Sequence, residues 1–266
     1  MRKTKVFIDP GHNHSGYDTG AQGYGLKEQD ITYYIAEKLK AMLESSGVEV
    51  KMSRNTVTDN CDNSSITTSL RQRSNMANSW GADYFVSIHC NAGGGTGTEV
   101  YSYTYGSDAY KLAEKIQSKL VSATGLSNRG AKVANFSVLA RSNMPAVLVE
   151  TAFIDSAKDA KLLGSDSGRE IIAKAIYEGI LSHLGYKEGL TMSQYDELKA
   201  EINALREEKT PMIYNYIDDN MPEWARPTIQ KLVDKDLLKG GDEGLNLNED
   251  LMRILVINDR AGLYEK

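Results

Sequence analysis

Residues 83–90 read Asp-Tyr-Phe-Val-Ser-Ile-His-Cys, a nearly continuous apolar run in the middle of the chain. A run of this kind, without regular alternation of polar and apolar residues, is typical of a strand that helices cover on both faces. Residues 146–150, Ala-Val-Leu-Val-Glu, form a second such run. Two doubly covered strands indicate an α/β domain built around a mostly parallel sheet.

The segments around these two strands alternate between the two hydrophobic periods. Spacing of two residues or short β-branched runs predict further strands, and spacing of three to four predicts helices. Strands are expected at 5–9, 48–52 and 98–103, and helices at 29–45, 69–80, 107–124 and 168–185. Val133, Val138 and Leu139 are expected in a short extended stretch. The predicted fold of residues 1–186 is a twisted, mostly parallel sheet flanked by helices.

The composition changes after Tyr186. Residues 187–209 are expected to form a linker helix, because the segment 194–209 is rich in Glu, Lys, Ala and Leu and repeats its apolar residues as a heptad seam. Barely two heptads are present, so a helix that lies on a neighbour and a short coiled coil that forms a homodimer both remain open. Residues 210–266 are expected to form a small helical domain, with one helix near 224–233 and another that begins at Asn248.

Composition excludes several classes of protein. The 266 residues carry a net charge of −5 and no basic stripe, which argues against nucleic acid as a partner. No apolar stretch approaches the length of about 20 residues that a membrane helix needs. The apolar run after the basic N-terminus has only three residues, too few for a signal peptide, so we expect synthesis in the cytoplasm and action elsewhere after release.

The chemically informative residues lie where the predicted strands end. His12 follows the first strand, while His89 and Glu150 close the two buried strands. The carboxyl ends of parallel strands meet at one edge of a sheet, so these three side chains are expected close together. Glu28 belongs to the same edge, because it lies at the start of the helix that follows the first strand-end loop.

Two imidazoles and a carboxylate are the ligands of a catalytic zinc ion, which keeps a fourth position open. A further carboxylate beside the metal supplies the general base that hydrolysis needs. A lone histidine at a strand end is more often a structural, hydrogen-bonded residue. Glu150 is harder to explain in that way, because a carboxylate that closes an apolar strand is costly to bury without a partner.

Five motifs in unbroken order resemble a known family. They are Val-Phe-Ile-Asp-Pro-Gly-His at 6–12, Leu-Lys-Glu at 26–28, Leu70 with Arg73 and Ala-Asn at 77–78, Ser-Ile-His-Cys-Asn-Ala at 87–92, and the segment 145–154. They resemble the zinc N-acetylmuramoyl-L-alanine amidases of the third amidase type, found as bacterial autolysins and phage endolysins. The resemblance implies cleavage of the amide between muramic acid and L-alanine in peptidoglycan.

The resemblance also implies roles for individual residues. It implies one zinc ion held by His12, Glu28 and His89, with Glu150 as the catalytic base. Placement alone leaves Asp18 and Asp30 as rivals of Glu28 for the metal, although Asp30 directly precedes Ile31 and can simply cap the helix. His14 is a rival of His12, but only His12 occupies the motif position, so His14 is expected as an exposed rim residue.

Several neighbouring polar residues are candidates for other roles. Asn91 follows the ligand strand and is expected to position the substrate, while Arg141 and Asn143 are expected to meet a carboxylate of the stem peptide. Arg73 is expected to tie its helix to a loop, and His183 to face solvent. Cys90 is expected to point away from the metal into packing, because successive strand side chains alternate. Cys61 lies in a long polar loop, where a role at the rim and a plain surface loop are about equally favoured.

The last 57 residues loosely resemble a single S-layer-homology repeat, through Trp224-Ala225, the pair Gly240-Gly241 and Arg253. That resemblance implies attachment to a secondary cell-wall polymer, which would raise the effective concentration of a wall hydrolase. A phage or prophage endolysin is the favoured setting. A bacterial autolysin, a zinc peptidase acting on stem peptides and a non-catalytic wall-binding protein are the alternatives, and intact candidates for ligands and base argue against the last.

Overall fold

The computed structural model describes residues 3–186 and 212–265. The chain divides into two compact units, residues 1–196 and 197–266. The segment 194–209, expected to carry a heptad helix, lies outside the described residues. No helix in the described part of the chain is both long enough and apolar enough to cross a membrane.

The first unit is built on a six-stranded sheet with the order β4-β1-β5-β8-β6-β7. Its strands are β1 (Lys5–Pro10), β4 (Glu49–Met52), β5 (Tyr84–Asn91), β6 (Thr98–Ser102), β7 (Asn128–Val133) and β8 (Ala146–Phe153). A separate two-stranded hairpin consists of β2 (Gln22–Gly23) and β3 (Leu26–Lys27). Its helices are α1 (Glu28–Ser45), α2 (Ile66–Trp80), α3 (Asp108–Thr124), α4 (Ser137–Ala140), α5 (Ala157–Gly164) and α6 (Asp166–His183).

The strand directions bring the chain's polar motifs to one edge. Strands β4, β1, β5 and β8 are parallel, whereas β6 runs antiparallel to β8 and β7 runs parallel to β6. The predicted mostly parallel α/β sheet is therefore confirmed. In the register between β5 and β8, His89 lies beside Glu150, which places two of the candidate residues next to each other at the carboxyl ends of their strands.

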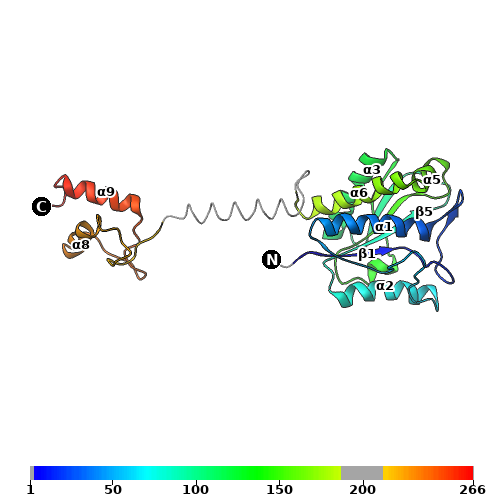
Figure 1. The fold of residues 1–266 in the computed structure, drawn as a ribbon, viewed down its shortest axis with the longest axis horizontal. Coiled ribbons are helices and arrows are strands. Elements are labelled where there is room, and N and C mark those ends of the chain that lie inside the picture. The colour runs from blue at the N-terminus through cyan, green and yellow to red at the C-terminus, as the bar shows by residue number, and fades with distance from the viewer. Residues whose placement is uncertain (1–2, 187–211, 266) are drawn as a thin grey trace. The chain divides into compact units, whose positions relative to one another are not determined.

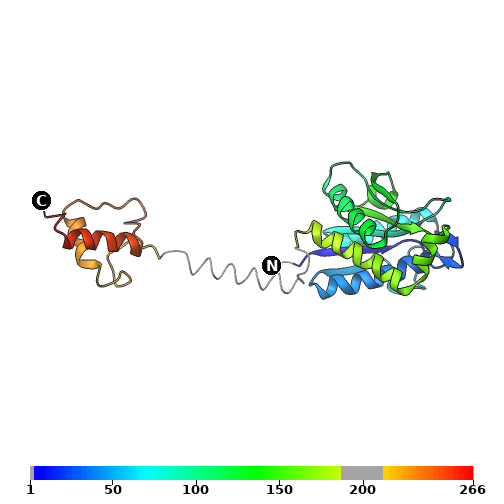
Figure 2. The ribbon, with the colours of Figure 1, turned by 90° about the horizontal axis from the view of Figure 1, so that it is seen from above.

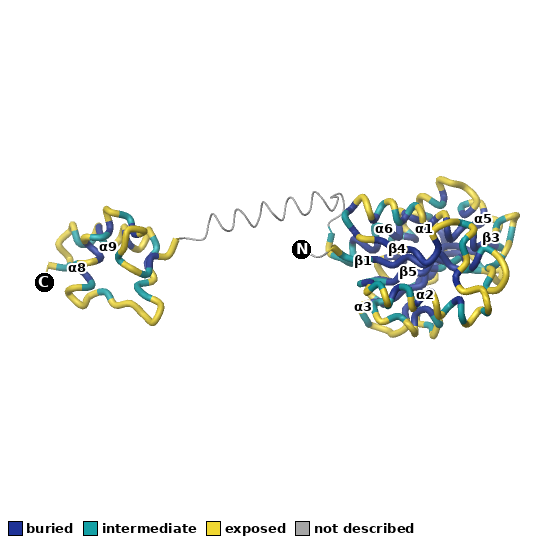
Figure 3. Tube along the Cα trace, turned by 60° about the horizontal axis from the view of Figure 1, so that its bottom comes forward, coloured by how far each residue is buried: buried dark blue, intermediate teal, exposed yellow. Residues whose placement is uncertain are grey.

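Helices cover both faces of this sheet. Helices α1, α3 and α6 lie side by side on one face, and α2 lies with α4 on the other (Figures 1 and 2). The larger core fills the first face and includes Ile8, Val86 and Val149, all fully buried. A smaller core on the second face stacks Phe7 on Phe85. The strands of the sheet are accordingly the most buried part of this unit (Figure 3).

One predicted stretch is corrected by the structure. Val133 ends β7 as expected, but Val138 and Leu139 belong to the short helix α4. Both of these residues are buried against the second face. Consecutive residues on a strand point to opposite faces, so two adjacent residues that are buried on the same side fit a helical turn and not a strand.

The second unit is small and helical. Its helices are α8 (Arg226–Asp234) and α9 (Glu249–Arg260), and the Asn248 side chain accepts a hydrogen bond from the Leu251 amide at the start of α9. This confirms the two predicted helices and the predicted cap. A compact apolar core, centred on Met221, Ile229 and Met252, holds the unit together.

The contact between α3 and α6 yields a stability prediction. A Cβ atom at Gly179 would lie 2.6 Å from the Ile116 Cα atom, too close for two real atoms, and backbone cannot move aside cheaply. We expect Gly179→Ala to lower the free energy of unfolding by about 1–3 kcal/mol, the range for overpacked cores. Urea denaturation followed by circular dichroism measures the change.

Gly164→Ala is the matched control, because its new methyl group would meet only Leu26 side-chain atoms at 3.5 and 3.7 Å. Alanine is also the better helix former, so the control should equal or slightly exceed the wild type in stability. Equal unfolding midpoints for Gly179→Ala and the wild type would show that the two helices do not need this close approach.

Candidate metal centre

Three donor atoms converge at the carboxyl edge of the sheet. They are the Nε2 atom of His12, the Oε1 atom of Glu28 and the Nδ1 atom of His89. The two nitrogens lie 3.2 Å apart, and each is 3.1 Å from the carboxylate oxygen. Ligand atoms of a tetrahedral zinc ion, bound at about 2.0–2.1 Å, lie about 3.3–3.4 Å from one another. The donor set and its spacing therefore fit a zinc ion.

Each ligand comes from a different element. His12 lies in the loop after β1 with φ 68°, a left-handed conformation that is uncommon for residues other than glycine. Glu28 is the first residue of α1, and His89 lies near the end of β5. The parallel arrangement of β1 and β5 thus gathers residues that are 77 positions apart.

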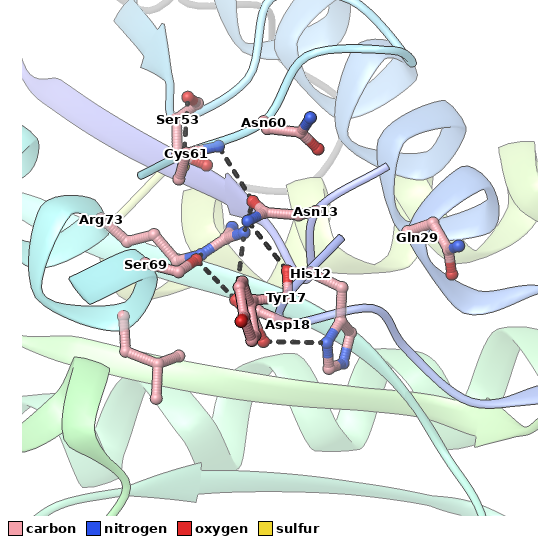
Figure 4. Close-up of polar contacts among 12 residues, drawn as sticks. His12, Asn13, Tyr17, Asp18, Gln29, Ser53, Asn60, Cys61, Ser69 and Arg73 are labelled. Carbon is pink, nitrogen blue, oxygen red and sulfur yellow. Dashed lines mark hydrogen bonds and ion pairs between the residues drawn. The ribbon is translucent and has the colours of Figure 1, made fainter. Parts of the chain in front are cut away.

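The ring of His12 is oriented from behind by a carboxylate. Asp18 Oδ1 lies 3.3 Å from the Nδ1 atom of His12, on the side of the ring that faces away from the other ligands (Figure 4). Asp18 in turn accepts a hydrogen bond of 2.6 Å from the Ser69 hydroxyl. Carboxylates behind metal-binding histidines fix the ring and raise its basicity. Asp18, a rival ligand on placement alone, thus lies on the far nitrogen of His12.

A buried arginine holds the loop that carries His12. Arg73 Nη1 donates to Asp9 Oδ1 at 2.7 Å and to the Pro10 carbonyl at 2.9 Å, and its Nη2 donates to Asn13 Oδ1 at 3.0 Å. The expectation that Arg73 ties its helix to a loop is confirmed (Figure 4). Burial alone would raise the pKa of Asp9, but Arg73 and the Ser53 hydroxyl outweigh it and hold that pKa below its ordinary value.

Two glycines leave the space that the ligands occupy. A Cβ atom at Gly11 would lie 2.4–2.7 Å from three atoms of the His89 ring. At Gly20 it would lie 2.7 Å from the Glu28 Cβ atom and 2.9 Å from the His12 Cδ2 atom. Neither position has room for a methyl group, so the packing of the site requires glycine at both.

Glu28 is held by backbone as well as by the imidazoles. Its Oε2 atom accepts from the Ala21 amide at 2.8 Å, and its Oε1 atom accepts from the Cys90 amide at 2.9 Å. Burial would raise the pKa of Glu28, but the hydrogen bonds and charges of His12 and His89 leave it well below its ordinary value. The carboxylate is therefore charged at any pH near neutrality.

Glu150 lines the same cavity, and its pKa is shifted in the opposite direction from that of Glu28. The cavity measures about 420 Å³, and His12, Glu28, His89, Asn91 and Glu150 all line it. Within the described residues, the Oε2 atom of Glu150 has no hydrogen-bond partner. Burial raises the pKa of Glu150 to about 7, with further contributions from the charges of Glu28 and Glu99 against those of the two histidines. A carboxyl group in this state exchanges protons near neutral pH.

The three residues expected to bind substrate do not lie together. Asn91 lines the cavity and donates from its Nδ2 atom to Glu99 Oε1 at 2.6 Å. Arg141 and Asn143 do not line it: Arg141 donates to the Ser137 hydroxyl, and Asn143 lines another cavity, near the amino end of β8. The chain turns between α4 and β8 at these residues, so they precede the strand whose far end carries Glu150.

The remaining histidines and cysteines do not belong to the group of three donor atoms. His14 is partly exposed, and its Nδ1 atom lies 3.8 Å from Asp30, apart from the three donor atoms. His183 does not face solvent as expected, because only 8% of its side chain is exposed and its ring packs edge-on against Tyr84. Cys90 is buried in the core, as expected. Cys61 is buried too, so it is not a rim residue: its amide donates to Asn13 beneath the His12 loop.

A charged cluster on β6 and β7 was missed by the sequence analysis. Glu99 is almost completely buried, and Arg129 and Lys132 both form ion pairs with its Oε2 atom. The register places Glu99 directly beside Glu150 on the neighbouring strand. A single charged residue in the strand 98–102 was the available signal, because such a residue needs partners when it is buried.

Comparisons with known proteins agree in what they find. The sequence pattern of a family described as "N-acetylmuramoyl-L-alanine amidase" matches residues 6–182. The sporulation-specific N-acetylmuramoyl-L-alanine amidase of Bacillus subtilis is 40% identical over 207 residues, which are 75% of this chain and 77% of that protein. The endolysin of Bacillus phage SPP1 is 38% identical over 191 residues, 69% of this chain and 67% of the endolysin.

A solved structure has the same fold. The crystal structure of an N-acetylmuramoyl-L-alanine amidase from Clostridium difficile matches with a TM-score of 0.62 and 34% identity. The match covers 70% of this chain and the whole of that one.

The buried Asp9 carboxylate yields a prediction about stability and pH. Because its folded pKa is lowered, Asp9 contributes stability that is fully present above the unfolded value of about 4 and is lost as the pH falls through the folded value. We expect the free energy of unfolding to fall between about pH 5 and pH 2, and to fall less steeply in Asp9→Asn. Urea denaturation at a series of pH values measures both slopes.

Glu114→Gln, a change on the exposed side of α3, serves as the control and should keep the wild-type slope. A slope in Asp9→Asn as steep as that of the wild type would mean that other carboxylates account for the acid sensitivity.

Proposed function

The chain belongs to the N-acetylmuramoyl-L-alanine amidase family, and we propose that it catalyses this hydrolysis with one zinc ion held by His12, Glu28 and His89. It is an enzyme, and its substrate is peptidoglycan, in which it cleaves the amide between N-acetylmuramic acid and L-alanine. The observation that carries the zinc proposal is the mutual spacing of 3.1–3.2 Å among the three donor atoms.

The residues of this chain divide the chemistry between them. A zinc ion bound at this site supplies Lewis-acid chemistry beside the scissile carbonyl. Glu150 takes the proton of the attacking water and returns it to the amine of the departing L-alanine. Its raised pKa suits both steps, because a base that titrates close to neutral pH both accepts and gives up a proton readily.

Asn91 orients the substrate in this proposal. Its side-chain carbonyl accepts the Ala92 amide at 2.8 Å and its amide nitrogen is fixed on Glu99, so the group is held in one rotamer at the wall of the cavity. Fixed dipoles near a reacting carbonyl lower the barrier without the cost of reorganisation. Arg141 and Asn143 lie outside this cavity, so they have no role in the proposed reaction.

We place this activity in the lysis of a bacterial wall by a phage or prophage endolysin. The similarity to a phage endolysin supports that setting, and the similarity to a sporulation-specific amidase supports a bacterial autolysin of the same chemistry. Both settings require the enzyme to reach the wall after release from the cytoplasm.

Purified cell walls test the reaction and its machinery together. We expect the wild type to release new amino termini of L-alanine, and Glu150→Gln to lower the rate by at least 10²-fold, the lower range for a lost general base. Removal of metal with a chelator should abolish release, and zinc should restore it. Mass spectrometry identifies the new ends.

His12→Ala and His14→Ala form the matched pair for the metal site. Zinc bound per chain, measured by elemental analysis, should fall from one to near zero in His12→Ala and stay at one in His14→Ala, because only His12 belongs to the donor set.

In the digestion of cell walls, new carboxyl ends within the stem peptide would identify a peptidase. Full activity of Glu150→Gln would rule out the proposed base.

For the second unit we propose attachment to a secondary cell-wall polymer. The guanidinium of Arg253 lies 5.4 Å from the ring centroid of Trp224, and both side chains are substantially exposed. An exposed aromatic ring beside a cation offers stacking and ionic contacts to an anionic polymer. Dimerisation through residues 194–209 remains a sequence-based proposal, since those residues lie outside the described part.

We expect Arg253→Gln to weaken sedimentation with purified walls several-fold, and the remaining binding to depend less on salt. Arg260→Gln removes an exposed cation from the same helix and should bind as the wild type does. Co-sedimentation in the inactive Glu150→Gln background measures both. Equal binding by all three proteins would assign the second unit another role.

A further inference from the structure

A second cavity lies at the carboxyl edge of the sheet, beyond the segment 92–97. It measures about 650 Å³, and its walls include Gly94, Thr96, Asn128, Arg129 and Asp155. The segment 92–97 separates it from the catalytic cavity, because Asn91 and Ala92 line the catalytic cavity and Gly94 to Thr96 line the second one. The two cavities are therefore neighbours on the same edge.

Two carboxylates hold the dividing segment in place. Asp155 Oδ2 accepts the amides of Gly93 and Gly94 at 2.7 and 2.8 Å. Asp159, which is fully buried, accepts the Thr96 hydroxyl at 2.6 Å and the Gly97 amide at 2.8 Å. A glycine-rich segment with this many backbone anchors is a fixed wall, so the shape of the second cavity exists before any ligand binds.

Arg129 lines this cavity, and only part of its guanidinium group is engaged in contacts within the protein. Its Nε atom donates to Glu99 Oε2 at 2.9 Å, and its guanidinium carbon lies 4.9 Å from the centroid of the Phe153 ring. Its two terminal nitrogens have no hydrogen-bond partner among the residues that the structure describes, and 37% of the side chain is exposed. The Nε atom and the flat face of this guanidinium are thus held by the protein. The two terminal nitrogens remain as a planar fork that can pair with a carboxylate through two hydrogen bonds.

The ion-pair cluster that contains Arg129 has an excess of positive charge. Glu99 is shared by Arg129 and Lys132, so the three groups together carry one net positive charge. Asp155, which also lines this cavity, adds one negative charge, and its Oδ2 atom accepts the two glycine amides. Its Oδ1 atom is buried and has no hydrogen-bond partner in the described part of the chain. A free carboxylate is therefore the ligand group that the open fork of Arg129 fits.

Glu99 links this fork directly to the catalytic cavity. One of its oxygens accepts from the Asn91 side chain at 2.6 Å and the other from Arg129 at 2.9 Å. Asn91 in the catalytic cavity is thus connected to Arg129 through the Glu99 carboxylate and two hydrogen bonds. About two residues of extended chain, at about 3.3–3.6 Å each, span such a distance.

We propose that the second cavity binds the stem peptide of the substrate and that Arg129 pairs with a free carboxylate on the residues that follow L-alanine. This rests on the proposed function, because it takes the scissile amide to lie beside Glu150. Arg129 thereby takes the role that the sequence predicted for Arg141 and Asn143, which is contact with a carboxylate of the stem peptide. The enzyme accordingly prefers stem peptides in which the carboxylate after L-alanine is free over stem peptides in which that carboxylate is amidated.

Two synthetic muramoyl-peptides test the proposal, one with the free acid at the second stem residue and one with the amide. We expect the wild type to cleave the acid with a kcat/KM about 10–100-fold higher, the range for one charge-assisted bidentate contact. Arg129→Gln should reduce this ratio to about one, because KM should rise much more for the acid than for the amidated substrate. Arg129→Lys should keep part of the ratio, because it keeps the charge and loses the fork.

Lys132→Gln is the matched control. It removes the other cation that pairs with Glu99, but Lys132 lies over Tyr101 and does not line the second cavity. It should therefore retain the wild-type ratio. A wild-type ratio near one, an unchanged ratio in Arg129→Gln or an equal loss on both substrates would each overturn the proposal, the last because a purely structural ion pair gives that pattern.

Binding measured without cleavage separates this inference from the proposed mechanism. Calorimetric titration of Glu150→Gln with both muramoyl-peptides should show the same preference for the acid, and Glu150→Gln combined with Arg129→Gln should lose it. Cleavage by the Glu150→Gln protein would contradict the proposed base, whereas equal affinities for acid and amide in that protein would contradict the role of Arg129.

Discussion

The candidate site depends on one ion pair that is buried beneath it. Asp9 and Arg73 are almost fully buried and lie 2.7 Å apart, and Arg73 also holds the Pro10 carbonyl and the Asn13 side chain. A charge in such a position is costly unless it is paired, and the loss of one partner leaves the other uncompensated. The loop that bends His12 into its left-handed conformation is therefore fixed by electrostatics and not by apolar packing alone.

Two glutamates at the same edge differ in protonation because their partners differ. Glu28 has two imidazoles and two backbone amides as partners, so its charged form is favoured. Burial raises the pKa of Glu150 to about 7, its Oε2 atom has no hydrogen-bond partner among the described residues, and it lies beside Glu99. Pairs of carboxyl groups with opposed environments are a recurrent arrangement for dividing two roles between two identical side chains.

The sheet and three of the four central residues were predictable because their signals are local. A nearly continuous apolar run ends at His89 and another apolar run at Glu150, and a Pro-Gly turn precedes His12. The helical arrangement of Val138 and Leu139, the burial of His183 and Cys61, and the fork of Arg129 depend on contacts between distant segments. Periodicity describes which face of an element is apolar, but it does not report which neighbour covers that face.

The two glycines beside the ligands have a consequence for how this enzyme can change. No side chain fits at Gly11 or Gly20, so the wall formed by His12, Glu28 and His89 is closed to variation at those positions. Strand β7, in contrast, is an edge strand of the sheet. It carries Arg129, whose two terminal nitrogens have no hydrogen-bond partner in the described part of the chain. A hydrolase aimed at walls of a different chemistry is therefore best engineered from β7 inward, since residues there alter what is recognised and leave the reacting groups in place.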